Sequence, residues 1–98
     1  MSIEFENRIS VVIPTYNRSH TLMRAINSVL SQTHPAFEII VVDDGSTDGT
    51  KELLQAHGFC KKDTKELEKK YLIQENGGVS SARNLGVKNA KGDFIAFL

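Results

Sequence analysis

The sequence predicts an α/β fold: an open, mostly parallel, Rossmann-like sheet of about four strands with helices on both faces. Short runs rich in β-branched residues alternate along the chain with segments whose apolar residues recur at helical spacing. The first run, Ile9–Thr15, is apolar at nearly every position, which is typical of a strand buried on both faces of a parallel sheet. Strands that alternate with helices pair in parallel through right-handed crossovers.

The first part of the chain predicts a strand, a helix and a second strand. Pro14 is expected to end the first strand, because proline cannot donate a hydrogen bond to a β-ladder. Asn17 or Ser19 can cap the helix that follows. The second strand is predicted over residues 37–43 and runs into two adjacent aspartates. The predicted helix has one apolar face, formed by Leu22, Ala25, Ile26, Val29 and Leu30.

The middle of the chain predicts a second helix and a charged connection. The helix is expected to start at Thr47 or Asp48 and to stop at Gly58, since glycine is favoured just past a helix end. Cys60 is expected to be an ordinary free thiol in a connecting region. The charged segment 61–70 is expected to form a solvated helix or loop.

The last third of the chain predicts two short strands with a helix between them. The strands are expected over residues 71–74 and 93–98. The helix is expected to open at Ser80 or Ser81 and to close at Gly92. The order of elements therefore alternates between strand and helix along the whole chain.

The composition is that of a soluble globular domain, with 98 residues, 40% hydrophobic and 24% charged. Twelve basic and twelve acidic residues cancel, so neither nucleic acid nor an anionic membrane is expected as the main partner. A single cysteine excludes an internal disulfide framework and fits a reducing compartment. Residues 1–7 lack the features of a signal peptide, and no apolar run approaches the ~20 residues of a membrane span. We therefore expect a cytoplasmic location, with membrane association left open for a longer parent protein.

Polar clusters follow three of the predicted strands at their carboxyl ends. They read "PTYNRS", "DDGSTDGT" and "ENGGVSSARN". In open α/β sheets, ligands bind outside the carboxyl ends of the strands, so neighbouring strands would bring these clusters to one rim. The fingerprints of P-loop and dinucleotide-binding proteins are absent, and the three histidines lack metal-ligand spacing. These absences leave the three clusters as the candidate site.

The residue types in these clusters suit a nucleotide. Tyr16 offers a flat aromatic surface for a base, and Asp44 can accept hydrogen bonds from a ring N–H or a ribose hydroxyl. Because adjacent side chains of an extended backbone point in opposite directions, we expect one of Asp43 and Asp44 to face a ligand and the other to hold the turn through backbone N–H groups. Arg83, near a helix start, offers a guanidinium group for a phosphate. Taken singly, each residue also has an ordinary structural explanation, and "GSTDGT" is also an ordinary turn with a helix cap.

The segments "SVVIPTYNRSHTLMRAINSVLSQTHPAFEIIVVDDGSTDGT" and "NGGVSSARNLGVKNAKGDFIAFL" closely resemble the start of family-2 glycosyltransferases with the GT-A fold. The resemblance spans roughly residues 8 to 98 in four ordered blocks, and segment 59–70 looks like an insertion. It implies that residues 1–98 form the nucleotide-sugar-binding N-terminal part of a GT-A domain, and that this part is incomplete.

The resemblance also implies a function. A sugar would pass from a nucleotide-sugar, most often a UDP-sugar, to an acceptor hydroxyl with inversion. Pro14 and Thr15 would shape the base pocket, and Tyr16 would stack on uracil. Asp44 would bind the uracil ring, and Asp43 would support the turn. Arg83 would lie near the base or the diphosphate. The substrate-binding residues implied in this way are Pro14, Thr15, Tyr16, Asp43, Asp44 and Arg83.

The resemblance further implies a divalent cation, Mn²⁺ or Mg²⁺, in the full-length parent. In the family, an Asp-x-Asp motif that binds this cation follows the strand that "DFIAFL" resembles, and the general base comes later still. The sequence given stops before both, at Leu98. We therefore expect the 98-residue chain to contain no catalytic residue, to need no metal of its own and to be inactive, whereas the parent is an enzyme.

Two other functions stay open from the sequence. One is a non-catalytic nucleotide-binding or interaction module of the same fold, for which an exposed sheet edge would serve as the interface. The other is a nucleotide-binding domain of a redox enzyme, which the missing glycine fingerprint disfavours. A homodimer through the sheet edge or the apolar surface around "FIAFL" is expected under the leading interpretation.

Overall fold

Strands and helices alternate along the chain in the computed structural model, which describes residues 8–32, 36–59 and 68–98. The predicted α/β class is therefore confirmed. Within these ranges, no helix is long and apolar enough to cross a membrane. Cys60 and segment 61–67 lie outside the described residues. The elements are β1 (Ile9–Thr15), α1 (Ser19–Leu30), β2 (Glu38–Asp43), α2 (Thr50–Ala56), β3 (Glu68–Ile73), α3 (Val79–Asn89) and β4 (Phe94–Phe97).

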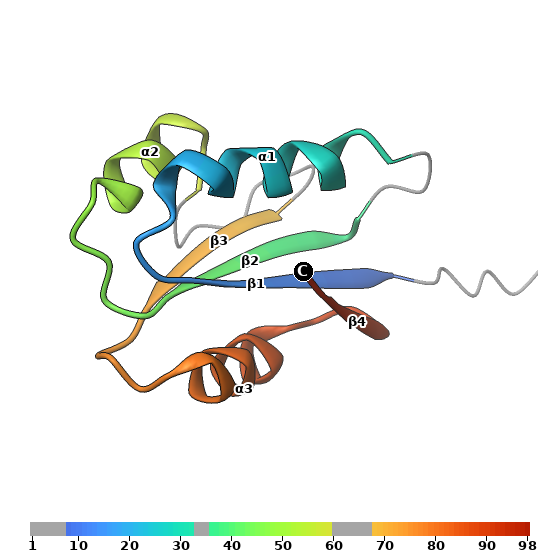
Figure 1. The fold of residues 1–98 in the computed structure, drawn as a ribbon. Coiled ribbons are helices and arrows are strands. Elements are labelled where there is room, and N and C mark those ends of the chain that lie inside the picture. The colour runs from blue at the N-terminus through green and yellow to red at the C-terminus, as the bar shows by residue number, and fades with distance from the viewer. Residues whose placement is uncertain (1–7, 33–35, 60–67) are drawn as a thin grey trace, which may run out of the picture.

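The four strands form one open sheet in the order β3-β2-β1-β4, and every neighbouring pair is parallel. Figure 1 shows α1 and α2 on one face of this sheet and α3 on the other. Thr15 pairs with Asp43, and Asp43 pairs with Ile73. The carboxyl ends of β1, β2 and β3 therefore lie side by side, which is the arrangement that the three polar clusters require to share one rim.

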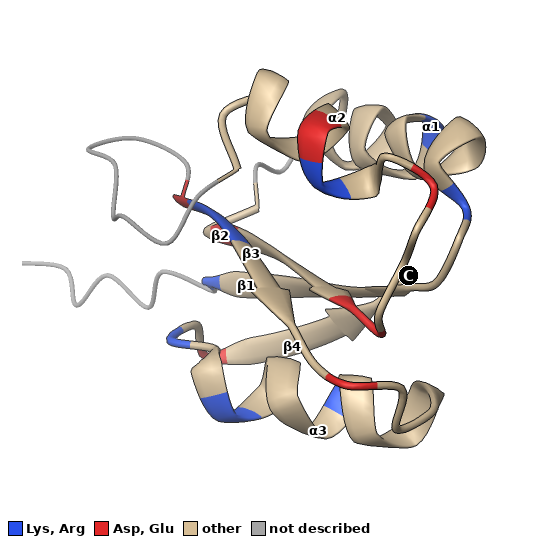
Figure 2. Cartoon of the chain, turned by 90° about the vertical axis from the view of Figure 1, so that its left-hand side faces the viewer, with Lys and Arg blue, Asp and Glu red and all other residues tan. Residues whose placement is uncertain are grey.

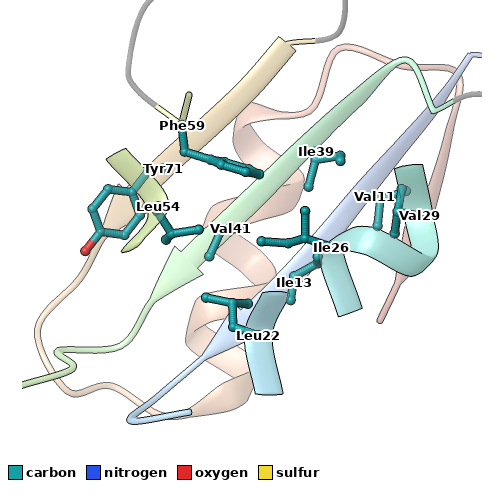
Figure 3. Close-up of a cluster of buried hydrophobic side chains, with 10 residues drawn as sticks. All are labelled: Val11, Ile13, Leu22, Ile26, Val29, Ile39, Val41, Leu54, Phe59 and Tyr71. Atoms are coloured by element: carbon teal, nitrogen blue, oxygen red, sulfur yellow. The ribbon is translucent and has the colours of Figure 1, made fainter. Parts of the chain in front are cut away.

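The larger core lies between the sheet and the helices α1 and α2. Leu22, Ile26 and Val29 form the buried side of α1, as the helical spacing predicts. Phe59, just past α2, is almost fully buried, although the sequence places it at the start of an insertion. Figure 3 shows this cluster, which consists of Val11, Ile13, Leu22, Ile26, Val29, Ile39, Val41, Leu54, Phe59 and Tyr71.

The smaller core lies between the sheet and α3. Val12, Ile40 and Val42 point to this face, and Ala82 of α3 packs on them. Gly86, one helical turn further along α3, lies so close to Val12 that a Cβ atom added there would overlap the valine methyl Cγ1. A side chain at this position would push α3 away from β1.

Two expectations about the strands are wrong. Pro14 does not end β1; it lies inside the strand and pairs with Val42. Val12 accepts a hydrogen bond from Leu98 on the β4 side of β1, and Pro14 faces that same side beyond the paired part of β4, so its missing N–H interrupts no ladder bond. The third strand starts at residue 68, so Lys70 belongs to β3 and not to a solvated segment.

A buried ionic cluster explains why charged residues take part in β3. Glu38 is fully buried, and its Oε1 lies 2.9 Å from Lys70 Nζ. Its Oε2 accepts hydrogen bonds from Ser10 Oγ at 2.5 Å and from the backbone N–H of Lys91 at 2.6 Å. Burial alone would raise the pKa of Glu38, but these hydrogen bonds and Lys70 outweigh it and lower that pKa. The cluster joins β1, β2, β3 and Lys91, just past the end of α3. It lies toward the amino ends of the strands, whereas the polar clusters lie at the carboxyl ends.

The helices begin differently from the prediction. No described residue caps α1, α2 or α3 with its own N-cap side chain; the N-cap positions are Arg18, Gly49 and Gly78. Two polar residues expected as caps, Asn17 and Asp48, instead accept hydrogen bonds from the backbone N–H groups of Thr47 and Ser19. The polar residues therefore join the loops at the rim.

Candidate nucleotide-binding site

The loops that follow β1 and β2 are bound to each other at the carboxyl edge of the sheet. Asn17 has a positive φ of 49°, and its backbone N–H donates to Ser46 Oγ at 2.8 Å. Its side-chain oxygen accepts from the backbone N–H of Thr47, also at 2.8 Å. Ser19 N–H donates to Asp48 Oδ2 at 3.0 Å. These cross-loop bonds fix the backbone on both sides of residue 18.

The adjacent aspartates point in opposite directions, as expected for an extended backbone. Asp43 faces the side of α1 and α2, where its Oδ2 accepts a hydrogen bond from the Tyr71 hydroxyl at 2.8 Å. Its Oδ1 accepts from the backbone N–H of Ser46 at 2.8 Å. Asp43 is only 2% exposed and does not line the cavity described below. Its contacts hold the turn after β2 against β3.

Asp44 faces the other side and binds the loop between β3 and α3. Its Oδ1 accepts hydrogen bonds from Gln74 Nε2 at 2.8 Å and from Gly77 N–H at 2.7 Å. Its Oδ2 accepts from Gly78 N–H at 3.0 Å. The Gln74 and Gly77 hydrogen bonds hold the pKa of Asp44 below its usual value, so the group is a carboxylate at neutral pH. Gly78 has a φ of 92°, a conformation that side-chain-bearing residues rarely adopt.

A cavity of about 370 Å³ opens at this rim. Three of its walls come from the three predicted clusters: the end of β1, the turn after β2 and the start of α3. Figure 2 shows acidic segments along the loops of this edge, and basic segments next to the start of α1 and on α3. The lining residues are Pro14, Thr15, Tyr16, Arg18, Asp44, Val79, Ala82, Arg83 and Leu98.

The groups in the cavity differ in how firmly they are held. Tyr16 is 47% exposed, so one side of its ring is open to a ligand. Arg83 has its guanidinium carbon 5.7 Å from the centre of the Phe97 ring, which is within the range of a cation–π contact. Asp44 is buried and bound by three donors, and only its Oδ2, which takes a single hydrogen bond, keeps acceptor capacity.

The structure brings together five of the six residues that the sequence singles out: Pro14, Thr15, Tyr16, Asp44 and Arg83. Sequence reasoning missed Arg18, which lines the same cavity, and Gln74, which holds Asp44. Both had a signal, because Arg18 lies in the first polar cluster and Gln74 ends the predicted third strand.

A family model described as "Glycosyl transferase family 2" matches residues 10–98. The chain belongs to glycosyl transferase family 2. An uncharacterised glycosyltransferase of Rickettsia conorii is 52% identical over 93 residues, which are 95% of this chain and 14% of that protein. The chain thus spans about one seventh of the length of this relative.

Solved structures of two glycosyltransferases share the fold. A mannosyltransferase from Pyrobaculum calidifontis in complex with GDP-Man and Mn²⁺ matches with a TM-score of 0.76 and 26% identity, over 90% of this chain and 26% of that one. Glucosyl-3-phosphoglycerate synthase from Mycobacterium tuberculosis, in complex with Mn²⁺, UDP and glucosyl-3-phosphoglycerate, matches with a TM-score of 0.69 and 27% identity. The second match covers 95% of this chain and 33% of the synthase. The expected GT-A fold is confirmed by these neighbours.

Proposed function

We propose that this chain is the donor-binding part of an inverting glycosyltransferase that transfers a sugar from a UDP-sugar to an acceptor hydroxyl. The observation that carries the proposal is the convergence of Tyr16, Asp44 and Arg83 on one cavity at the carboxyl edge of the sheet. The family and the nucleotide or nucleotide-sugar ligands of the two solved neighbours support it. Residues 1–98 would then be an incomplete domain of a cytoplasmic or membrane-associated parent.

Each wall of the cavity has a role in this proposal. The half-exposed ring of Tyr16 stacks on the uracil, and Pro14 and Thr15 limit the depth of the base pocket. Asp44 Oδ2 accepts a hydrogen bond from the base. Gln74, Gly77 and Gly78 hold the carboxylate in place for this contact. Arg83 faces the same space with a guanidinium suited to phosphate. Asp43 acts indirectly, by holding the turn that carries Asp44.

The described residues do not fit a metal ion by themselves. They contain no group of three or more His, Cys, Asp or Glu side chains that can hold one. The oxygens of Asp43 and Asp44 already accept five hydrogen bonds between them, and the two side chains point to opposite faces. Both solved neighbours contain Mn²⁺. We therefore propose that the full-length parent binds a divalent cation, Mn²⁺ or Mg²⁺, through residues of the parent outside positions 1–98.

Titration of the ¹⁵N-labelled 98-residue chain with UDP tests the donor site. We expect shifts of the amide signals around Tyr16, Asp44 and Arg83 at millimolar UDP, nearly independent of added Mn²⁺. Tyr16→Ala should weaken binding roughly 5- to 150-fold, the range for loss of one aromatic stacking partner of a base. Tyr16→Phe keeps the ring and should bind nearly as the wild type does.

The proposal fails if millimolar UDP shifts no amide signal, or if Tyr16→Ala binds UDP as the wild type does. GDP and ADP in parallel titrations distinguish a uracil site from a site for any nucleotide. Incubation of the chain with a UDP-sugar and an acceptor should give no transfer above the buffer control, because no general base is proposed within these residues.

A further inference from the structure

Arg18 lines the same cavity as Tyr16 and Arg83, although no sequence motif assigned it a role. We propose that Arg18 is a second anion-binding residue of the donor site and holds the diphosphate of the nucleotide-sugar together with Arg83. This inference rests on the proposed donor-binding function and adds a residue to it.

The backbone around Arg18 is fixed, whereas its guanidinium is not used. The residue before it is bound to Ser46 and Thr47, and the residue after it is bound to Asp48. The carbonyl oxygen of Arg18 accepts hydrogen bonds from the N–H groups of Thr21 and Leu22 in the first turn of α1. Within residues 8–32, 36–59 and 68–98, no hydrogen bond or ion pair involves its guanidinium. A fixed backbone with an unused, charged side chain at a cavity wall is the arrangement expected of a ligand-binding residue.

The charges in the cavity favour an anion. Arg18 and Arg83 contribute two positive charges, and Asp44 is the one acidic residue among the described lining residues. The Asp44 carboxylate is already bound by three N–H donors, so little of its charge is left to neutralise the arginines. Guanidinium groups bind phosphate oxygens in a planar, two-pronged geometry. The ligand chemistry that fits is the diphosphate of a nucleotide.

The spacing along the chain agrees with a base on Tyr16 and phosphates near Arg18. Tyr16 and Arg18 are two positions apart in the chain, so their Cα atoms are at most ~7 Å apart. This is the scale of the ribose that lies between a base and its phosphates. Arg83 approaches from α3, on the other side of the sheet from α1, so the two arginines reach the cavity from opposite layers.

The test compares three probes, UDP, uridine and inorganic pyrophosphate, by amide-shift titration of the 98-residue chain. We expect Arg18→Gln to weaken UDP binding roughly 10-fold, the effect of losing a charge-assisted hydrogen bond, and to leave uridine binding unchanged. Arg83→Gln should weaken UDP binding as well. Arg24→Gln is the matched control, because Arg24 is an exposed arginine of α1 that does not line the cavity. The dispersion of each amide spectrum shows whether the variant is folded.

The outcomes separate the inference from the function on which it rests. If UDP binds and Arg18→Gln leaves its affinity unchanged, or weakens uridine equally, the role of Arg18 is overturned and the donor site remains. If pyrophosphate binds in an Arg18-dependent way but UDP binds no better and uridine not at all, the anion site remains and the nucleotide assignment fails. If none of the three probes binds the wild type, both are overturned.

Discussion

Gln74 Nε2 donates a hydrogen bond to Asp44 Oδ1 at 2.8 Å, and this contact joins the carboxyl ends of β3 and β2. The other end of the same amide, Oε1, accepts a hydrogen bond from Ser81 Oγ at 3.3 Å. Gln74 therefore links the candidate base-binding carboxylate to the first turn of α3. It does not line the cavity, so we regard it as a positioning residue.

Gln74→Ala should raise the pKa of Asp44 toward its usual value, because it removes the hydrogen bond that lowers this pKa most. The Gly77 and Gly78 donors remain, so the change should be partial. Carboxyl ¹³C signals followed against pH measure that pKa directly. UDP binding should weaken several-fold. Gln55→Ala, in the exposed part of α2, serves as the control and should change neither quantity. An unchanged pKa of Asp44 in Gln74→Ala would contradict the positioning role.

The fold and the site differ in how much of each could be predicted from sequence. Alternating β-branched runs and amphipathic helices are local patterns, so the class and the number of strands could be predicted. The meeting of Tyr16, Asp44 and Arg83 could be predicted only on the condition that the strands before them are neighbours. The contact of Gln74 with Asp44 depends on β3 lying next to β2, and alternation alone does not determine strand order. The expectation that Lys70 is solvated is wrong because it, too, depends on strand order. Its partner Glu38 lies on the neighbouring strand β2.

Asp48→Asn should destabilise the chain at neutral pH and much less in acid. Hydrogen bonds from Thr50 Oγ1 and from Ser19 N–H lower the pKa of Asp48 from 3.8 to about 2. A carboxyl group whose pKa is lower in the folded state stabilises the folded state at pH values above its unfolded pKa of 3.8. This contribution is lost as the pH falls through the folded pKa of about 2. We expect a loss of at most about 1 kcal/mol at pH 7, because the group is exposed to solvent.

Urea unfolding at a series of pH values measures this difference. The gap in unfolding free energy between Asp48→Asn and the wild type should shrink as pH falls from 3.8 toward 2. Glu75→Gln removes a charge from another exposed carboxylate and controls for the overall charge. A gap that stays constant across this range would show that the Asp48 charge does not hold the first two loops together.

Gly86→Ala should destabilise the fold, because the added methyl group would overlap Val12 in the fully buried centre of β1. Overpacking of this kind costs about 1–3 kcal/mol, which outweighs the gain of alanine over glycine in a helix. Asn84→Ala, at an exposed position of the same helix, should leave stability unchanged or raise it slightly. Urea midpoints of the two variants test the prediction. Equal stability of Gly86→Ala and the wild type would mean that α3 packs less closely on β1.

The edge strand β4 is the surface on which we expect the 98-residue chain to associate. Within the described residues, β4 pairs only with β1, so its outer edge has unpaired backbone groups. Phe94, Ile95, Phe97 and Leu98 are all exposed, and residues 94–98 contain neither a charge nor a proline that would prevent edge-to-edge pairing. An apolar cavity of about 130 Å³ adjoins the strand. A second copy that pairs along this edge would cover much of the exposed apolar surface.

Sedimentation velocity over a range of concentrations tests this association. The wild type should shift from monomer to dimer as concentration rises, and Phe94→Lys should remain monomeric at the same concentrations. Val87→Lys replaces an apolar residue of α3 that is 40% exposed, so it matches the gain in charge without touching the β4 edge, and it should dimerise as the wild type does. A wild type that stays monomeric throughout would exclude pairing through β4. Equal loss of dimer in both lysine variants would point to general electrostatic repulsion rather than to this edge.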